Sequence, residues 1–150
     1  MRGGHTARGG ARRFAAPGEP ASDLAAKAAI PALERAGVSA ADLDYLIVST
    51  STGDSPQPPT ANLVQDLIDA HRAACFDVNV VCAGFVFALS LARSLVALQP
   101  DATVLVVAAD VYSRLLDFSD RRTAVLFGAG AGAAVVGAVP AGYGVLETEL

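Results

Sequence analysis

The sequence predicts an α/β fold, a mixed sheet with flanking helices, from three observations. Short runs rich in apolar and β-branched residues alternate with helical patterns along the chain. One run, residues 103–109, is almost continuously apolar, which is typical of a strand buried on both faces of a largely parallel sheet. The chain has 150 residues, 53% of them hydrophobic, and is therefore long enough to bury one substantial core.

The expected elements follow from local patterns. Residues 1–20 are rich in Gly, Arg and Pro and predict a loose lead, followed by one domain over residues 21–150. The first helix is expected to begin at Ser22 or Asp23, to kink at Pro31 and to end at Gly37. Two more helices are expected over residues 62–70 and 84–98, and strands over residues 45–50, 75–80 and 103–109. Two last strands, residues 123–127 and 133–139, are expected to be joined or bulged at the intervening glycines.

Composition excludes several classes of function. The formal net charge of −4 predicts no nucleic-acid partner. No stretch approaches about 18 uninterrupted apolar residues, and no apolar segment follows the N-terminal arginines, so we expect no membrane span, no secretory signal and a cytoplasmic location. Cys75 and Cys82 are the only cysteines, too few for a disulfide scaffold or a zinc site.

Cys82 stands where the predicted strand over residues 75–80 meets the predicted helix over residues 84–98. The dipole and the unpaired N–H groups at the amino end of a helix stabilise a thiolate. The same N–H groups can donate to the oxyanion of acyl transfer, and the small neighbours Ala83 and Gly84 leave room for a thioester. The position indicates an acyl-accepting nucleophile, while a buried structural cysteine is the alternative that the spacing leaves open.

The segment around Cys82, residues 76–85 (FDVNVVCAGF), resembles the nucleophile segment of the β-ketoacyl-[acyl-carrier-protein] synthase III family in the thiolase-like superfamily. The likeness extends from about residue 12 to residue 137 and implies the N-terminal half of a thiolase-like fold. It implies that Cys82 takes an acyl group from acyl-CoA before a decarboxylative condensation with malonyl on an acyl carrier protein, without cofactor or metal.

The resemblance also implies roles for two other residues. Arg121 falls on a position that contacts coenzyme A in the family, whereas a surface salt bridge with Asp117 or Asp120 is the alternative. Gln57 takes the place of a phenylalanine that reaches across the family's dimer to close the partner's acyl pocket, so we expect a different or shorter acyl group.

Some features of the family are absent from the sequence. The family's catalytic His and Asn belong to a C-terminal half, its first strand precedes the matched region, and Ala129 replaces a usual aspartate. We therefore expect a homodimer or a complementary C-terminal half as partner. His5 and His71 are expected to be solvated rather than catalytic.

Three alternative functions remain open at this point. Residues 128–133 fit a relaxed dinucleotide-binding pattern, but the β-rich segment that follows disfavours the helix this pattern requires. An acyltransferase of the same superfamily would keep the cysteine without forming a carbon–carbon bond. A non-catalytic or split-enzyme subunit would contribute only a surface or half of an active site.

Overall fold

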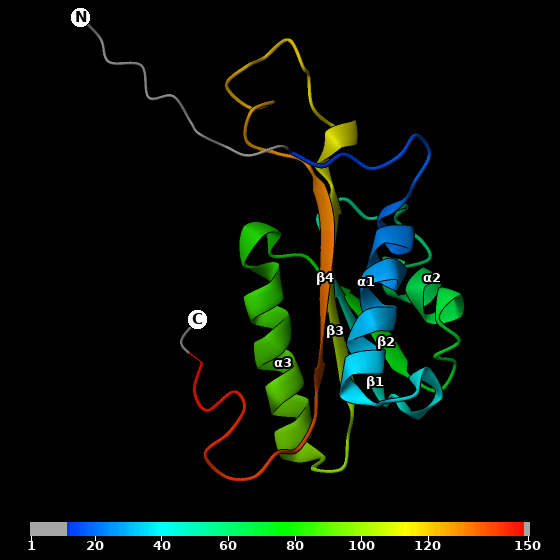
Figure 1. Ribbon diagram of the computed structural model, residues 1–150, viewed down its shortest axis with the longest axis vertical. Coiled ribbons are helices and arrows are strands. Elements are labelled where there is room, and N and C mark those ends of the chain that lie inside the picture. The colour runs from blue at the N-terminus through cyan, green and yellow to red at the C-terminus, as the bar shows by residue number, and fades with distance from the viewer. Residues whose placement is uncertain (1–11, 149–150) are drawn as a thin grey trace, which may run out of the picture.

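A four-stranded sheet divides the structure, a computed structural model that describes residues 12–148. Its strand order is β2-β1-β3-β4. β1 (Tyr45–Ser49), β2 (Ala74–Val78) and β3 (Val104–Val111) are parallel, and β4 (Ala129–Val136) is antiparallel to β3. Helices α1 (Ala21–Ala36) and α2 (Thr60–Leu67) cover one face, and α3 (Gly84–Leu98) covers the other (Figure 1). The predicted mixed α/β architecture is confirmed.

Alternating residues of the central strands fill two cores. Leu46, Val48 and Leu105 pack with α1 and α2, whereas Ile47 and Val106 pack with α3. Because successive side chains of a strand point to opposite faces, a continuously apolar strand is suited to this double burial. The apolar run over residues 103–109 therefore lies in the central strand β3, as expected.

Helix α1 agrees with its predicted span but is capped differently. Its cap position is Pro20, and the Asp54 carboxylate accepts the N–H groups of Ala21 (2.7 Å) and Ser22 (3.3 Å). The predicted local caps are therefore wrong, because a carboxylate from a distant loop satisfies the first N–H groups. Gly37 ends the helix with φ 65°, as predicted, and Pro31 lies inside it.

The end of the sheet differs from the prediction in two ways. Residues 123–126 form turns and Phe127 is irregular, so the predicted strand over residues 123–127 is wrong. Asp120 favours the turns, because it accepts hydrogen bonds from the backbone of Arg122 and from the hydroxyl of Thr123. β4 begins at Ala129, and its glycines pair with β3 in unbroken register, as in Asp110↔Gly130. The predicted bulge is therefore absent, and the strand ends at Val136.

Residues 12–20 contain neither helix nor strand but contact the fold. The carbonyl of Arg13 accepts a hydrogen bond from the N–H of Ala129 (2.9 Å), and the ring of Phe14 meets Phe118 edge-on at 5.7 Å. Residues 1–11 of the predicted lead lie outside the described residues. The division of the chain at residue 20 remains a prediction.

Residues 81–98, most of them in α3, are long and apolar enough to span a membrane by length and composition, although Ser90, Arg93 and Ser94 interrupt the apolar run. In this fold, Ala88 and Ala92 of α3 are buried against the sheet. The opposite side is exposed, with Val86 and Leu91 among its residues, and only 17% of the segment is buried. A core helix of a folded domain satisfies the same criteria as a membrane span.

Candidate functional site

Cys82 lies in the short turn that joins β2 to α3. The turn is a 3-10 helix over Val81–Ala83, and the thiol is exposed. Val81 has φ +48°, a left-handed conformation that a β-branched residue rarely adopts. The structure thus places the predicted nucleophile at the amino end of a 15-residue helix, where residues 12–148 leave it exposed rather than buried.

The backbone N–H groups of this turn differ in whether they already donate a hydrogen bond to a backbone carbonyl. The N–H of Ala83 donates to the carbonyl of Val80 (3.1 Å), and the N–H of Gly84 donates to Val81. Within residues 12–148, the N–H of Cys82 has no such partner. The expectation that several neighbouring N–H groups can stabilise an oxyanion therefore narrows to the amide of Cys82 itself.

Gly84 allows α3 to approach the sheet closely. Its backbone is ordinary helix (φ −54°), so a glycine is not required for its conformation. A Cβ at this position would lie 2.0 Å from Oγ of Ser49 in β1. Because Gly84 has no side chain, the start of α3 can pack closely against β1, and this contact fixes the position of the helix that follows Cys82.

Asp77, in the strand before Cys82, holds the amino end of α2. Its carboxylate accepts the N–H of Thr60 (2.8 Å) and the N–H of Ala61 (2.7 Å). Because the cap of α2 is Pro59, which has no polar side chain, Asp77 supplies the capping group. This tertiary cap explains why α2 begins two residues before its predicted start.

The cap predicts a large loss of stability for Asp77→Ala. Two charge-assisted hydrogen bonds disappear and two buried N–H groups lose their partner, at a cost of about 2–3 kcal/mol. Denaturant unfolding should show this loss, with a smaller one for Asp77→Asn, which keeps one acceptor. Asp66→Ala, on the exposed side of the same helix, should change the unfolding free energy by less than about 0.5 kcal/mol. Equal effects of the Asp77 and Asp66 substitutions would contradict the capping role.

A polar network lies beside the nucleophile turn, where β1, β2 and β3 end. The Asp110 carboxylate accepts the N–H of Ser51 (2.8 Å) and the hydroxyl of Thr52 (3.2 Å). The hydroxyl of Ser51 donates to Oδ1 of Asn79 (3.1 Å), which also accepts the N–H of Val81 (3.3 Å). No local sequence pattern reveals this network, because its members are up to 60 residues apart and meet only at the carboxyl edge of the sheet.

The predicted coenzyme-binding residue Arg121 belongs to the segment between β3 and β4. This segment lies at the same end of the molecule as the start of α3 (Figure 1). Asp120 pairs with Arg122 (2.9 Å), and this hydrogen bond lowers the pKa of the Asp120 carboxyl. Asp117 instead bonds Ser119. Within the described part of the chain, Arg121 is exposed and makes neither of the salt bridges considered as its alternative role.

Gln57 and Cys75 lie on other parts of the surface. Gln57 is exposed in the loop before α2, where its carbonyl accepts the hydroxyl of Ser55 (3.0 Å). Cys75 is half-buried, its sulfur contacts Asn62 (3.1 Å) and Gln65 (3.3 Å), and desolvation raises its pKa. Burial makes Cys75 the less reactive of the two thiols.

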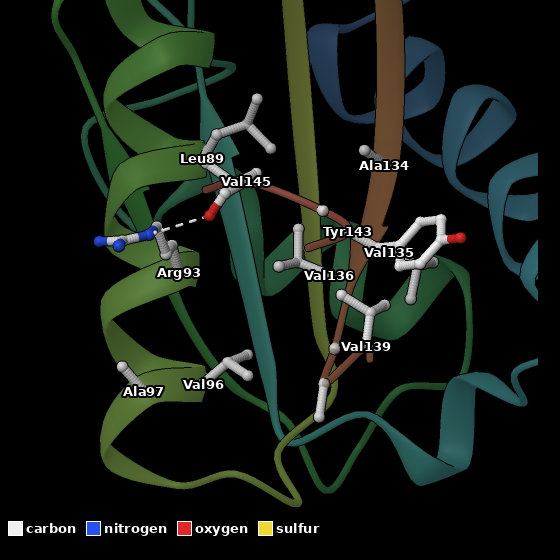
Figure 2. Close-up of a pocket in the computed structure, with 13 residues that line it drawn as sticks. Leu89, Arg93, Val96, Ala97, Ala134, Val135, Val136, Val139, Tyr143 and Val145 are labelled. Carbon is white, nitrogen blue, oxygen red and sulfur yellow. Dashed lines mark hydrogen bonds between the residues drawn. The ribbon is translucent and has the colours of Figure 1, made fainter. Parts of the chain in front are cut away.

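An apolar groove among the described residues is separate from Cys82. It has a volume of about 450 Å³ and lies between α3, β4 and the segment after β4 (Figure 2). Arg93 of α3 donates to the carbonyls of Val145 (3.0 Å) and Leu146 (3.1 Å), which fixes that segment along the helix. The groove is therefore formed where this segment packs against α3, and it is not part of the Cys82 site.

The topology decides the dinucleotide-binding alternative and the position of His71 relative to Cys82. The glycines of residues 128–133 lie within β4 or directly before it, and no helix follows them within residues 12–148, so the dinucleotide-binding alternative is excluded. His71 precedes the amino end of β2, whereas Cys82 follows its carboxyl end. His71 is therefore at the opposite edge of the sheet, beside Asp69 (3.4 Å), and His5 lies outside the described residues.

Residues 76–150 match the family described as 3-oxoacyl-[acyl-carrier-protein (ACP)] synthase III. The β-ketoacyl-[acyl-carrier-protein] synthase III of Xylella fastidiosa is 51% identical over 139 residues, which are 93% of this chain and 43% of the relative. The protein of the same name from Oleidesulfovibrio alaskensis is 49% identical over 129 residues, 86% of this chain and 39% of the relative. The chain thus spans about two fifths of the length of these relatives.

Solved structures agree with the sequence relatives. The β-ketoacyl-[acyl carrier protein] synthase III of Thermus thermophilus superposes with a TM-score of 0.83 at 44% identity, over 89% of this chain and 41% of that one. The priming β-ketosynthase of the R1128 polyketide biosynthetic pathway gives 0.80 at 41% identity, over 85% and 38%. The backbone confirms the fold class that the segment around Cys82 implies.

Proposed function

This chain belongs to the 3-oxoacyl-[acyl-carrier-protein] synthase III family, and on that premise we propose that Cys82 accepts the acyl group of an acyl-CoA. The observation that carries the proposal is the exposed thiol in the turn that opens α3. The N–H of Cys82, which has no backbone acceptor within residues 12–148, lies beside the sulfur, where it can donate to the oxyanion of acyl transfer.

The proposed first step is a thioester exchange. The Cys82 thiolate attacks the carbonyl carbon of the acyl-CoA, and the resulting oxyanion accepts the Cys82 N–H. The bond between the carbonyl carbon and the coenzyme sulfur then breaks. Coenzyme A leaves as a thiol with the proton that Cys82 has lost, and the acyl group stays on the protein. This step needs no metal or organic cofactor.

The proposed second step is the condensation. Malonyl on an acyl carrier protein loses carbon dioxide, and the carbanion attacks the Cys82 thioester to give a 3-oxoacyl product and a free thiol. Because His71 lies at the opposite edge of the sheet, this step needs groups beyond residues 12–148. We propose that a C-terminal half supplies them, in a cytoplasmic enzyme that acts as a homodimer.

We propose that Arg121 binds the phosphates of coenzyme A and that Gln57 limits the acyl pocket of a partner subunit. The exposed guanidinium of Arg121, at the same end of the sheet as Cys82, supports the first assignment. Gln57 is supported by its exposed loop and by its family position. A polar amide there disfavours long apolar acyl chains.

Arg121→Ala should raise the acyl-CoA concentration needed for half-maximal acylation of Cys82 about tenfold, since one charge-assisted contact to phosphate is lost. Arg122→Ala is the matched control, because this neighbouring guanidinium already pairs with Asp120. Titration of acylation with acyl-CoA measures both. Equal shifts in the two variants would contradict a specific role for Arg121.

The proposed function is tested by incubating the protein with acyl-CoAs of different chain length and recording intact mass and released coenzyme A thiol. We expect one acyl group per chain and one coenzyme A released per acyl group. Addition of malonyl carrier protein should then discharge the acyl group only where the groups of the second step are present. If no acyl-CoA in the panel acylates the protein, the proposal is wrong.

A further inference from the structure

We propose that Asp110 is a positioning residue for the nucleophile turn and acts on it through Ser51 and Asn79, an inference that rests on the proposed function of Cys82. Asp110 lies near the carboxyl end of β3, and Cys82 follows the carboxyl end of β2. Because β1 lies between these strands, the segment that follows β1 is the physical link between them.

Asp110 fixes the segment after β1 by several bonds from one carboxylate. Oδ1 of Asp110 accepts the N–H of Ser51 (2.8 Å) and the hydroxyls of Thr52 (3.2 Å) and Thr50 (3.4 Å). The hydroxyl of Thr52 also accepts the N–H of Val111 (2.7 Å), so the segment is bonded to both the side chain and the backbone of β3. A carboxylate is acceptor-only and matches these three donors.

Ser51 extends the network to the turn that contains Cys82. Its backbone N–H is held by Asp110, while its hydroxyl donates to Oδ1 of Asn79 (3.1 Å). The same Asn79 oxygen accepts the N–H of Val81 (3.3 Å). Val81 has the left-handed φ of +48°, so these contacts hold a strained residue directly before Cys82.

The conformation of Val81 sets the direction of the Cys82 N–H and of its thiol. An oxyanion contact depends on this direction, and misplacement by about 1 Å can cost 10²-fold in rate. Alkylation of a thiol by iodoacetamide forms no oxyanion and depends mainly on exposure and on thiolate content. The two reactions therefore distinguish positioning of the turn from general loosening of the fold.

The test uses Asp110→Ala, which removes the acceptor oxygen, with Ser51→Ala and Ser51→Thr, all in a Cys75→Ala background that leaves Cys82 as the only thiol. We expect the first two to slow acylation by acyl-CoA at least about tenfold while iodoacetamide alkylation changes less than about threefold. Ser51→Thr keeps the hydroxyl and should restore acylation to near the parent rate. Asp101→Ala is the control, because it removes a carboxylate at the other end of β3.

Acylation at the parent rate in Asp110→Ala and Ser51→Ala would overturn the proposal. A second outcome would also overturn it. If the rates of acylation and alkylation fall by the same factor and the melting temperature falls as well, the role of the residue is purely structural. Failure of the proposed function has a different signature, since the Cys75→Ala parent would then be alkylated at Cys82 without being acylated by any acyl-CoA.

Discussion

Replacement of Cys82 by Ala is expected to abolish acyl incorporation from acyl-CoA, whereas Cys75→Ala should retain it fully. The two thiols are only seven residues apart but lie in different environments. Cys82 is exposed at the amino end of α3, and Cys75 is half-buried against α2 with a raised pKa. Partial desolvation disfavours the thiolate of Cys75 and makes it the poorer nucleophile.

Intact mass after incubation with acyl-CoA measures this difference, and circular dichroism of both variants checks that they fold. The loss in Cys82→Ala should be at least about 10³-fold in rate, since no other described thiol can replace the nucleophile. Acyl incorporation that persists in Cys82→Ala and disappears in Cys75→Ala would reverse the assignment.

Gly84→Ala should have the largest effect of any single methyl group added near the site. The new Cβ would lie 2.0 Å from Oγ of Ser49, so α3 or β1 must shift. Such overpacking costs about 1–3 kcal/mol, and the shift would displace the Cys82 turn and slow acylation by about 10²-fold. Thermal unfolding and the acylation rate measure the two effects.

Two further variants show whether the clash is the cause. In the double variant Ser49→Ala with Gly84→Ala, the atom at 2.0 Å is gone and the next contact is the Cβ of residue 49 at 3.3 Å, so stability and acylation should partly recover. Gly130→Ala in β4 is the control, because a Cβ there has no neighbour within 4 Å. A Gly84→Ala protein that is as stable and as active as Gly130→Ala would refute the close-approach argument.

Periodic apolar patterns predicted the central elements well because these elements bury the faces that the patterns define. Helix α3 has the expected bounds, and β1 and β3 differ from expectation by no more than two residues at either end. Errors occur where distant residues decide the local structure. Asp54 caps α1 from more than 30 residues away, and pairing with β3 extends β4 through residues whose glycines predicted a bulge.

In the candidate site too, residues with a local sequence signal could be predicted and residues that act through distant contacts could not. Cys82 could be found from the sequence, because its motif and its strand-to-helix position are contiguous. Asp110 and Ser51 could not, because an isolated Asp at the end of a strand and an isolated Ser in a loop have no distinctive spacing. The one available signal was that Asp110 lies near the end of one apolar strand and Ser51 follows another, and that the carboxyl ends of these strands meet at one edge of a parallel sheet.

The most direct test of the central claim is to map the acyl group on the unaltered chain. Cleavage before aspartates separates the two thiols, because residues 69–76 contain Cys75 and residues 77–100 contain Cys82. After incubation with acyl-CoA, mass spectrometry should find the acyl group on the fragment 77–100, in thioester linkage that hydroxylamine removes. An acyl group found only on the fragment 69–76, or on neither fragment, would contradict the assignment of Cys82 as the nucleophile.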